Sequence, residues 1–228
     1  MAPVITIDGP SGSGKGTISR ALARALGFNL LDSGALYRLV ALAGRRAGLD
    51  LDDPAALAAK ALGLDIRFDS TPSGEERVLL DGVEVTQDIR SEQAGNDASR
   101  VAALGPVREA LLDRQRRFAQ APGLIADGRD MGTVVFPAAT LKIYLLASAQ
   151  ERAHRRYKQL MEKGLPANLP DLSRAIAERD RRDMTRAVAP LVPSADAVVI
   201  DSTGLSIDEV VAQVLQLARD RLEGRLNR

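Results

Sequence analysis

Cysteine is missing from the 228-residue sequence, which excludes disulfides, thiolate metal sites and a cysteine nucleophile. Tryptophan is missing as well, and histidine occurs once, within the charged run 151–156. A lone histidine among charged residues is typical of a solvated surface, and we interpret His154 in that way. Chemistry that depends on phosphohistidine, a Ser–His pair or a histidine-bound metal therefore has no support in the sequence.

Long apolar runs and a strong net charge are also missing. Charges interrupt every apolar run before it reaches membrane-spanning length, and the first residues lack the basic segment of a secretion signal. The formal net charge is +1, so no overall field attracts nucleic acid or an anionic membrane. We therefore expect a cytoplasmic protein whose partners are small molecules, with neither nucleic acid nor membrane among them.

The residues that are present describe an ordinary globular protein rich in arginine. Apolar residues make up 45% of the chain and charged residues 27%. Of the 31 basic residues 26 are arginines, whose planar guanidinium groups match two phosphate oxygens at once. A GC-rich genome produces the same bias, so a role in phosphate binding has to be argued for each arginine separately.

Short apolar runs alternate with helical patterns along most of the sequence. Strands are predicted at residues 4–8, 28–31, 124–126, 141–146 and 198–200. Helices are predicted at 17–26 and 35–47, from Asp53-Pro54 onward, and after capping-box motifs at 148–151 and 206–209. This alternation predicts an α/β fold with a five-stranded parallel sheet flanked by helices.

One region breaks the alternation. Short β-prone runs at 64–68, 78–80 and 83–85 are separated by a polar turn at 71–74 and by Asp81-Gly82. Asp-Gly between two such runs is a strong hairpin signal, because both central residues of the favoured turn need positive φ. The region therefore predicts a small antiparallel sheet inserted into the fold, followed by helices at 91–104 and 106–119.

A glycine-rich motif lies between the first predicted strand and the first predicted helix. It consists of Gly9, Pro10, Ser11, Gly12, Ser13, Gly14, Lys15, Gly16 and Thr17. In this context glycines let backbone N–H groups surround the phosphates of a nucleotide, and Lys15 reaches the β- and γ-phosphate oxygens. Gly16 stands where a Ser or Thr usually follows the lysine, so the ligand of Mg²⁺ stays open, with Thr17 as one candidate.

Four further motifs occur in register with this loop. They are Asp-Ser-Gly-Ala-Leu-Tyr-Arg at 32–38, Ile-Ala-Asp-Gly-Arg-Asp-Met-Gly at 125–132, Glu-Arg-Asp-Arg-Arg-Asp at 178–183 and Arg-Ala-Val-Ala-Pro-Leu at 186–191. Together they resemble bacterial cytidylate kinases, which are nucleoside monophosphate kinases with a P-loop. The resemblance covers essentially the whole chain and implies ATP-dependent phosphorylation of CMP and dCMP by a Mg²⁺-requiring monomer.

The resemblance also implies a division of the chain and a set of site residues. The P-loop kinase core would comprise 1–36 and 105–228, with a monophosphate-binding region at 37–104, its antiparallel insert at 64–85, and a lid at 155–169. The acceptor phosphate would be bound by Ser33, Arg38, Arg129 and Arg186, the base by Ser99, Arg108 and Asp130, and the sugar by Arg179 and Asp183. The transferring group would be contacted by Lys15, Arg129, Arg179, Arg186 and the lid residues Arg155 and Arg156, and the metal by Thr17 and Asp127.

For several of these residues, a purely structural role stays open as an alternative to the functional one. Asp127 ends an apolar strand, where an aspartate can also cap a turn. Arg155 and Arg156 can equally form a solvated helix face, and Asp130 can serve only to orient Arg129.

For the reaction we expect direct in-line transfer without a phosphoenzyme, because phosphoryl transfer needs positioning and charge neutralisation more than a protein nucleophile. Two other functions share the glycine-rich loop: a P-loop kinase acting on AMP, UMP or shikimate, and a nucleotide-binding switch. An ATP-coupled assay across a panel of monophosphates distinguishes the three.

Overall fold

The chain divides into two compact units. The computed structural model describes residues 2–70, 76–162, 164 and 166–226. One unit, here called the core unit, comprises Met1–Asp32 and Gln115–Arg228, and the other, the insert unit, comprises Ser33–Arg114. Each unit is described in turn.

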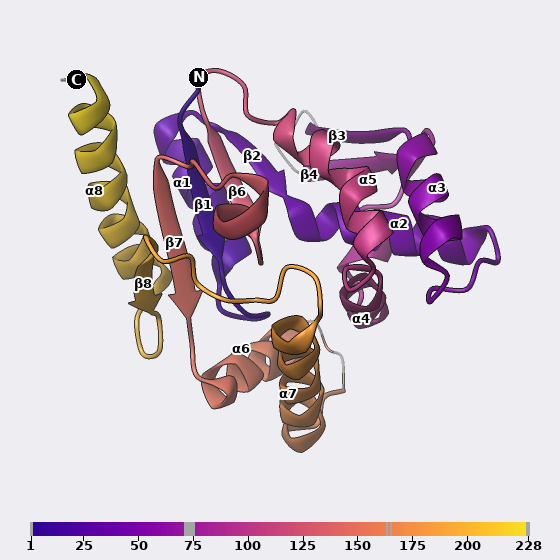
Figure 1. Cartoon of the computed structure of the whole chain (residues 1–228). Coiled ribbons are helices and arrows are strands. Elements are labelled where there is room, and N and C mark those ends of the chain that lie inside the picture. Colours follow the sequence, from indigo (N-terminus) through magenta and orange to yellow (C-terminus); the bar gives the residue numbers. More distant parts are fainter. Residues whose placement is uncertain (1, 71–75, 163, 165, 227–228) are drawn as a thin grey trace. The chain divides into compact units, whose positions relative to one another are not determined.

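A five-stranded sheet forms the centre of the core unit (Figure 1). Its order is β2 (Asn29–Asp32), β6 (Leu124–Gly128), β1 (Val4–Asp8), β7 (Leu141–Leu146) and β8 (Val198–Asp201), and all neighbouring strands are parallel. Every residue of β1 and β6 is buried, as expected of strands that are covered on both faces. The parallel five-stranded sheet predicted from the alternating pattern is therefore confirmed.

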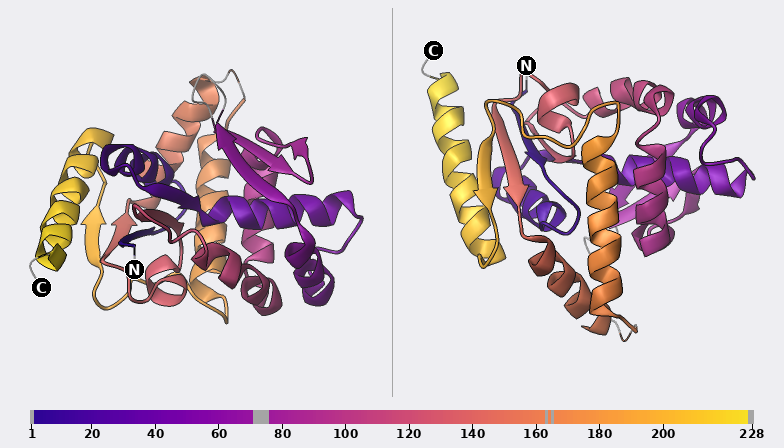
Figure 2. Two further views of the ribbon diagram at one scale, coloured as in Figure 1. Left: turned by 90° about the horizontal axis from the view of Figure 1, so that it is seen from above. Right: turned by 60° about the horizontal axis from the view of Figure 1, so that its bottom comes forward.

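Two helices cover part of this sheet. Helix α1 (Lys15–Leu26) packs against α8 (Ile207–Leu226), and α8 also contacts β7 (Figures 1 and 2). Between them lies a core of buried apolar side chains, which includes Ile5, Ile7, Leu22, Ile143 and Val214. Burying one such side chain stabilises the fold by about 1.5–3 kcal/mol, so this core anchors the strand ends that carry the site.

The two predicted capping boxes differ in outcome. At the start of α8 the Ser206 N–H donates to Glu209 Oε2 at 2.8 Å, and the Glu209 N–H donates to Ser206 Oγ at 3.2 Å, as predicted. At the start of α6 (Ala149–Glu162) only one half forms, from the Glu151 N–H to Ser148 Oγ at 3.1 Å. The prediction of a reciprocal bond there was wrong, because the Ser148 N–H donates to Thr203 Oγ1 instead.

Helices α6 and α7 (Leu169–Thr185) pack against each other within the core unit (Figure 1). The side chain of Asn168 caps α7 by accepting the Asp171 N–H at 3.3 Å. The predicted lid, 155–169, covers the second half of α6 and the residues before α7; positions 163 and 165 in it lie outside the described residues. Among the described residues, no helix has the length and apolar character required to cross a membrane.

The insert unit combines helices with a small antiparallel sheet. Its helices are α2 (Ser33–Arg46), α3 (Pro54–Gly63), a 3₁₀ turn (Asp88–Arg90), α4 (Glu92–Val101) and α5 (Gly105–Arg116), and its strands β3 (Ile66–Ser70), β4 (Glu76–Leu80) and β5 (Val83–Glu84) pair in that order. Asp81 and Gly82 have φ values of 51° and 80°, so the predicted hairpin turn is confirmed. The polar turn predicted at 71–74 lies outside the described residues.

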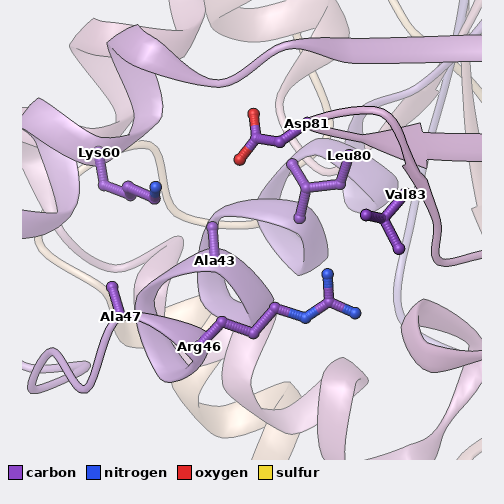
Figure 3. A pocket seen from close by; sticks show the side chains of 7 residues that line it. All are labelled: Ala43, Arg46, Ala47, Lys60, Leu80, Asp81 and Val83. Atoms are coloured by element: carbon purple, nitrogen blue, oxygen red, sulfur yellow. The ribbon is translucent and has the colours of Figure 1, made fainter.

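A shallow hollow of about 200 Å³ lies on the insert unit (Figure 3). Its lining includes Arg46 and Lys60 from two helices and Asp81 from the hairpin. Arg46 forms an ion pair with Asp88 at 3.0 Å, and Asp81 accepts the N–H of Asp65 at 3.1 Å. Arg46 and Asp81 are thus engaged within the unit, and we assign the hollow to the packing of the hairpin beside α2.

Candidate functional site

The candidate site of the core unit lies where three parallel strands end. Register pairs Asp8 of β1 with Gly128 of β6 and with Tyr144 of β7, so the loops that follow these strands leave from one edge of the sheet. Carboxyl ends of parallel strands are where open α/β sheets bind ligands. The loop after β1 is the glycine-rich motif predicted to hold phosphates.

Backbone conformation explains the glycines of this loop. Gly9, Gly12 and Gly14 have φ values of 149°, 78° and 93°, in a region that L side chains rarely adopt. Helix α1 follows directly, and its N-cap Gly14 offers no side chain to satisfy the first N–H groups. Donors left open at a helix N-terminus, together with the helix dipole, favour an anion such as a phosphate.

Lys15 is held beneath the loop, with 6% of its surface exposed. Its Nζ donates to the Pro10 carbonyl at 2.7 Å. Burial, together with the positive charges of Arg129 and Arg179, lowers the pKa of Lys15 to about 7, against the carboxylates of Asp127 and Asp8, which raise it. Several cations are therefore crowded at this point, and a polyanion bound here would relieve their repulsion.

Arg129 lies on the loop after β6 and pairs with a residue of α7. Its Nε donates to Asp183 Oδ2 at 3.0 Å, with side-chain exposures of 20% and 5%. Burial lowers the pKa of Arg129, but the carboxylates of Asp183, Asp127 and Asp8 outweigh burial and hold the pKa above its usual value. The structure therefore brings together Lys15, Arg129 and Asp183, which are far apart in the sequence.

Arg186 follows α7 as its C-terminal cap and is buried with Asp130. Its Nε donates to the Ala189 carbonyl at 2.6 Å, and its Nη2 lies 3.8 Å from Asp130 Oδ1. The side chains of Arg186 and Asp130 are each 3% exposed. A second predicted arginine and the predicted base-reading carboxylate thus occupy one buried position on the core unit.

The two predicted arginines of α6 bond to residues of the core unit. Arg155 donates to Glu151 Oε1 and to the Ser202 carbonyl, both at 2.8 Å, and Arg156 donates to its neighbour Gln159. A third arginine that the sequence analysis missed, Arg152, is the one whose hydrogen bond reaches the glycine-rich loop.

Arg152 is buried, with 4% of its surface exposed. Its Nη1 donates to the Ser11 carbonyl at 2.9 Å and to Asp180 of α7 at 3.0 Å, while its Nε donates to the Ala147 carbonyl at 3.0 Å. One side chain therefore ties the phosphate loop to the helix that carries Arg179 and Asp183. A guanidinium has five N–H donors, which is why an arginine can join three elements at once.

The predicted residues of the insert unit are mostly buried. Ser33, Ser99 and Arg108 are 4%, 5% and 7% exposed, and Arg38 is partly exposed. The Arg108 guanidinium lies 5.5 Å from the ring centroid of Tyr37, a cation–π arrangement. Its Nη1 donates to the Ala102 carbonyl at 3.0 Å, and this hydrogen bond fixes one edge of the guanidinium group.

The residues around Gly16 can accept a hard cation through a carboxylate. A Cβ atom at position 16 would lie 3.4 Å from Asp127 Oδ2 and 3.4 Å from Arg20 Nη1, so the glycine keeps space beside this carboxylate and the neighbouring guanidinium. Oxygen ligands suit Mg²⁺, which usually keeps several of its waters. In the described part of the chain, no group of three or more His, Cys, Asp or Glu residues could hold a metal by itself.

Comparison with known proteins gives a consistent result across the chain. The family model for cytidylate kinase matches residues 5–220. A cytidylate kinase from Shewanella loihica is 57% identical over 97% of this chain and 96% of its own length. One from Bordetella bronchiseptica is 59% identical over 96% of each chain, and one from Aeromonas hydrophila subsp. hydrophila is 58% identical over 97% and 96%. The chain belongs to the cytidylate kinase family.

Proposed function

We propose that the chain transfers the γ-phosphoryl group of ATP directly to the phosphate of CMP or dCMP, forming CDP or dCDP. The observation that carries the proposal is the buried Lys15 beside Arg129 and Arg179 under a glycine-rich loop, a site prepared for polyphosphate. Membership of the family supplies the acceptor.

On the donor side, residues 9–17 would hold the phosphates of ATP. Backbone N–H groups of the loop surround the β-phosphate, and Lys15 reaches the β- and γ-oxygens. Binding restores the charge that burial and neighbouring arginines remove from Lys15. The ammonium group then neutralises negative charge that develops as the phosphoryl group moves.

On the acceptor side, the proposal assigns each residue the role that the family motif implies. The phosphate is bound by Ser33, Arg38, Arg129 and Arg186, the base by Ser99, Arg108 and Asp130, and the sugar by Arg179 and Asp183. Arginines suit the phosphate because two polyanions must approach each other before transfer, and guanidinium groups offset their repulsion. The Arg129–Asp183 pair at 3.0 Å supports the proposal by holding one of these arginines in a fixed position.

When bound, Mg²⁺ would supply charge neutralisation and orientation of the donor phosphates. Asp127 is the residue proposed to hold it, directly or through water, with the Thr17 hydroxyl as a further oxygen. The space kept by Gly16 beside Asp127 supports this assignment. The test measures ATP affinity with and without Mg²⁺ in wild type and in Asp127→Asn. If Mg²⁺ changes ATP affinity equally in both proteins, the metal is held by other residues.

The reaction needs neither a phosphoenzyme nor a general base. The attacking oxygen belongs to an acceptor phosphate that is already ionised, so positioning and charge neutralisation suffice. Water must be excluded to prevent hydrolysis of ATP. We propose that residues 155–169 act as the lid that does so, with Arg155 and Arg156 exchanging their bonds to Glu151 and Gln159 for bonds to the transferring group.

Selection of cytosine over uracil is proposed to rest on Asp130 and Arg108, with Ser99 in support. Cytosine presents an amine donor beside a ring-nitrogen acceptor, whereas uracil presents an acceptor beside a donor. An ionised carboxylate accepts only, so Asp130 favours the cytosine amine and Arg108 donates to the acceptor side. Asp130→Asn should narrow the CMP-to-UMP ratio of kcat/KM by about 5- to 150-fold, mainly through lost CMP activity. Equal loss on both substrates would make Asp130 a positioning residue.

A coupled assay with ATP and CMP, dCMP, UMP or AMP in turn tests the proposed function. CMP and dCMP should be converted much faster than the others. We also propose, from the family, that the protein acts as a cytoplasmic monomer and divides into the core, monophosphate-binding and lid regions predicted from the sequence. Sedimentation velocity over a range of protein concentrations tests the monomer.

A further inference from the structure

We propose that Asp8, which lies outside the glycine-rich motif, is a positioning residue that fixes the turn Met131–Val135, which directly follows Arg129 and Asp130. The inference rests on the proposed function, because it assigns that turn to the acceptor. Asp8 is the last residue of β1 and is 5% exposed. Burial raises its pKa to about 7, against two backbone N–H groups that lower it.

Both oxygens of the Asp8 carboxylate accept backbone N–H groups of the turn. Oδ1 accepts the N–H of Met131 at 2.9 Å, and Oδ2 accepts the N–H of Gly132 at 2.8 Å. These are the first two residues of a short π-helical turn, Met131–Val135. The carboxylate therefore caps this turn from a neighbouring strand, at a sequence separation of 123 and 124 residues.

The cap supplied by Asp8 has a consequence for Asp130. Asp130 occupies the N-cap position of the turn, where an aspartate usually accepts the first N–H groups with its own side chain. Its side chain makes no such bond here, and its Oδ1 lies 3.8 Å from Arg186 Nη2. Because Asp8 satisfies the backbone donors, the Asp130 carboxylate can be directed to a substrate without leaving the turn uncapped.

Close packing against β1 and β7 also holds this turn. A Cβ atom on Gly132 would lie 3.0 Å from Thr6 Oγ1 and 3.2 Å from Lys142 Cδ. Thr6 precedes Asp8 by two residues on β1, so one strand both contacts and caps the turn. A turn fixed by two hydrogen bonds and close packing has little freedom, and the direction of its side chains depends on that backbone.

The test replaces the carboxylate by its amide in Asp8→Asn. An amide offers one oxygen acceptor and sets an NH₂ group against the other N–H, so one of the two bonds is replaced by repulsion. We expect KM for CMP to rise about 10- to 100-fold and the CMP-to-UMP ratio of kcat/KM to narrow, while KM for ATP changes by less than about 3-fold. A purely structural role would lower stability and shift both KM values together.

Asp201→Asn, at an exposed strand end, is the control for the loss of a carboxylate. Asp201 also ends a strand of the sheet and its Oδ1 accepts a backbone N–H, that of Thr203, at 2.9 Å. It lies on β8, outside the proposed site, and its replacement should leave KM for CMP unchanged. Thermal unfolding of both variants separates lost stability from lost positioning.

Two further measurements keep the inference open to refutation. Gly132→Ala leaves Asp8 intact but displaces the turn from Thr6 and Lys142. This variant should also raise KM for CMP and leave KM for ATP nearly unchanged. If Asp8→Asn does not fold, equal KM changes for CMP and ATP in Gly132→Ala would overturn the inference. Amide exchange in folded Asp8→Asn should be faster at Met131 and Gly132 than in wild type. Unchanged exchange would refute the cap even if the wild type proved inactive on CMP.

Discussion

Replacement of Gly9 by alanine tests the description of the loop at its first residue. Gly9 has φ +149°, and a Cβ atom there would lie 2.2 Å from the carbonyl oxygen of Leu145. That distance is more than about 1 Å short of a comfortable non-bonded contact. The close atom belongs to the backbone of Leu145 on β7. Because β7 pairs with both β1 and β8, this backbone cannot move without disturbing the sheet.

The expected cost has two parts. Forcing an alanine into a backbone region that only glycine adopts freely costs about 1–3 kcal/mol, and overpacking costs about 1–3 kcal/mol more. A loss of about 2–6 kcal/mol in the free energy of unfolding corresponds to a Tm lower by about 4–24 °C for a chain of this size. Phosphate affinity should also fall, because Gly9 is the first residue of the glycine-rich loop.

Thermal unfolding followed by circular dichroism, with ATP affinity measured beside it, gives the result directly. Gly63→Ala is the control, since Gly63 ends α3 and a Cβ there meets nothing within 4 Å. Its free energy of unfolding should stay within about 0.5 kcal/mol of wild type. If Gly9→Ala melted within a degree or two of that control, the close approach of the loop to β7 would be wrong.

Three further results are expected. Lys15→Met should keep the fold and lose about 10²- to 10³-fold or more in kcat, and near wild-type turnover would place the phosphates elsewhere. At pH 8, about one unit above the lowered pKa of about 7, Lys15 is mostly neutral before nucleotide binds, so calorimetry in two buffers with EDTA should find proton uptake when ATP binds. Lys15→Arg, which stays charged, should show none. Protease cleavage within 155–170 should slow when a bisubstrate analogue binds, and an unchanged rate would count against a lid.

Most of the fold could be predicted because its signals are local. Buried parallel strands are short apolar runs bounded by glycine, proline or charge, and β1 and β7 have the predicted bounds. Among the elements that were given a range, the errors lie at the ends, whereas α7 and the turn Met131–Val135 were not predicted. Strand β2 begins at Asn29 rather than 28, because the Phe28 N–H still bonds to the Ala23 carbonyl as part of the helix end. Likewise α1 begins at Lys15, two residues before its predicted start, because the loop turns directly into the helix.

The site was predictable only where a motif marks it. Lys15 and Arg129 stand in motifs, and the structure places them close enough to influence each other's charge. Asp8 and Arg152 gave no such signal, because their partners lie 123 and 141 residues away in the sequence. The one sign that pointed to Asp8 was an acidic residue at the end of a short, mostly apolar run directly before the loop.

The measurement that tests the account most directly is a competition between acceptors. CMP and UMP are offered together at equal concentration with ATP labelled at the γ-phosphate, and the labelled products are separated and counted. The ratio of products gives the ratio of kcat/KM without a difference in enzyme amount. The account predicts label mainly in CDP, with little in UDP and little released as free phosphate. Label mainly in UDP, or mainly as phosphate, would contradict it.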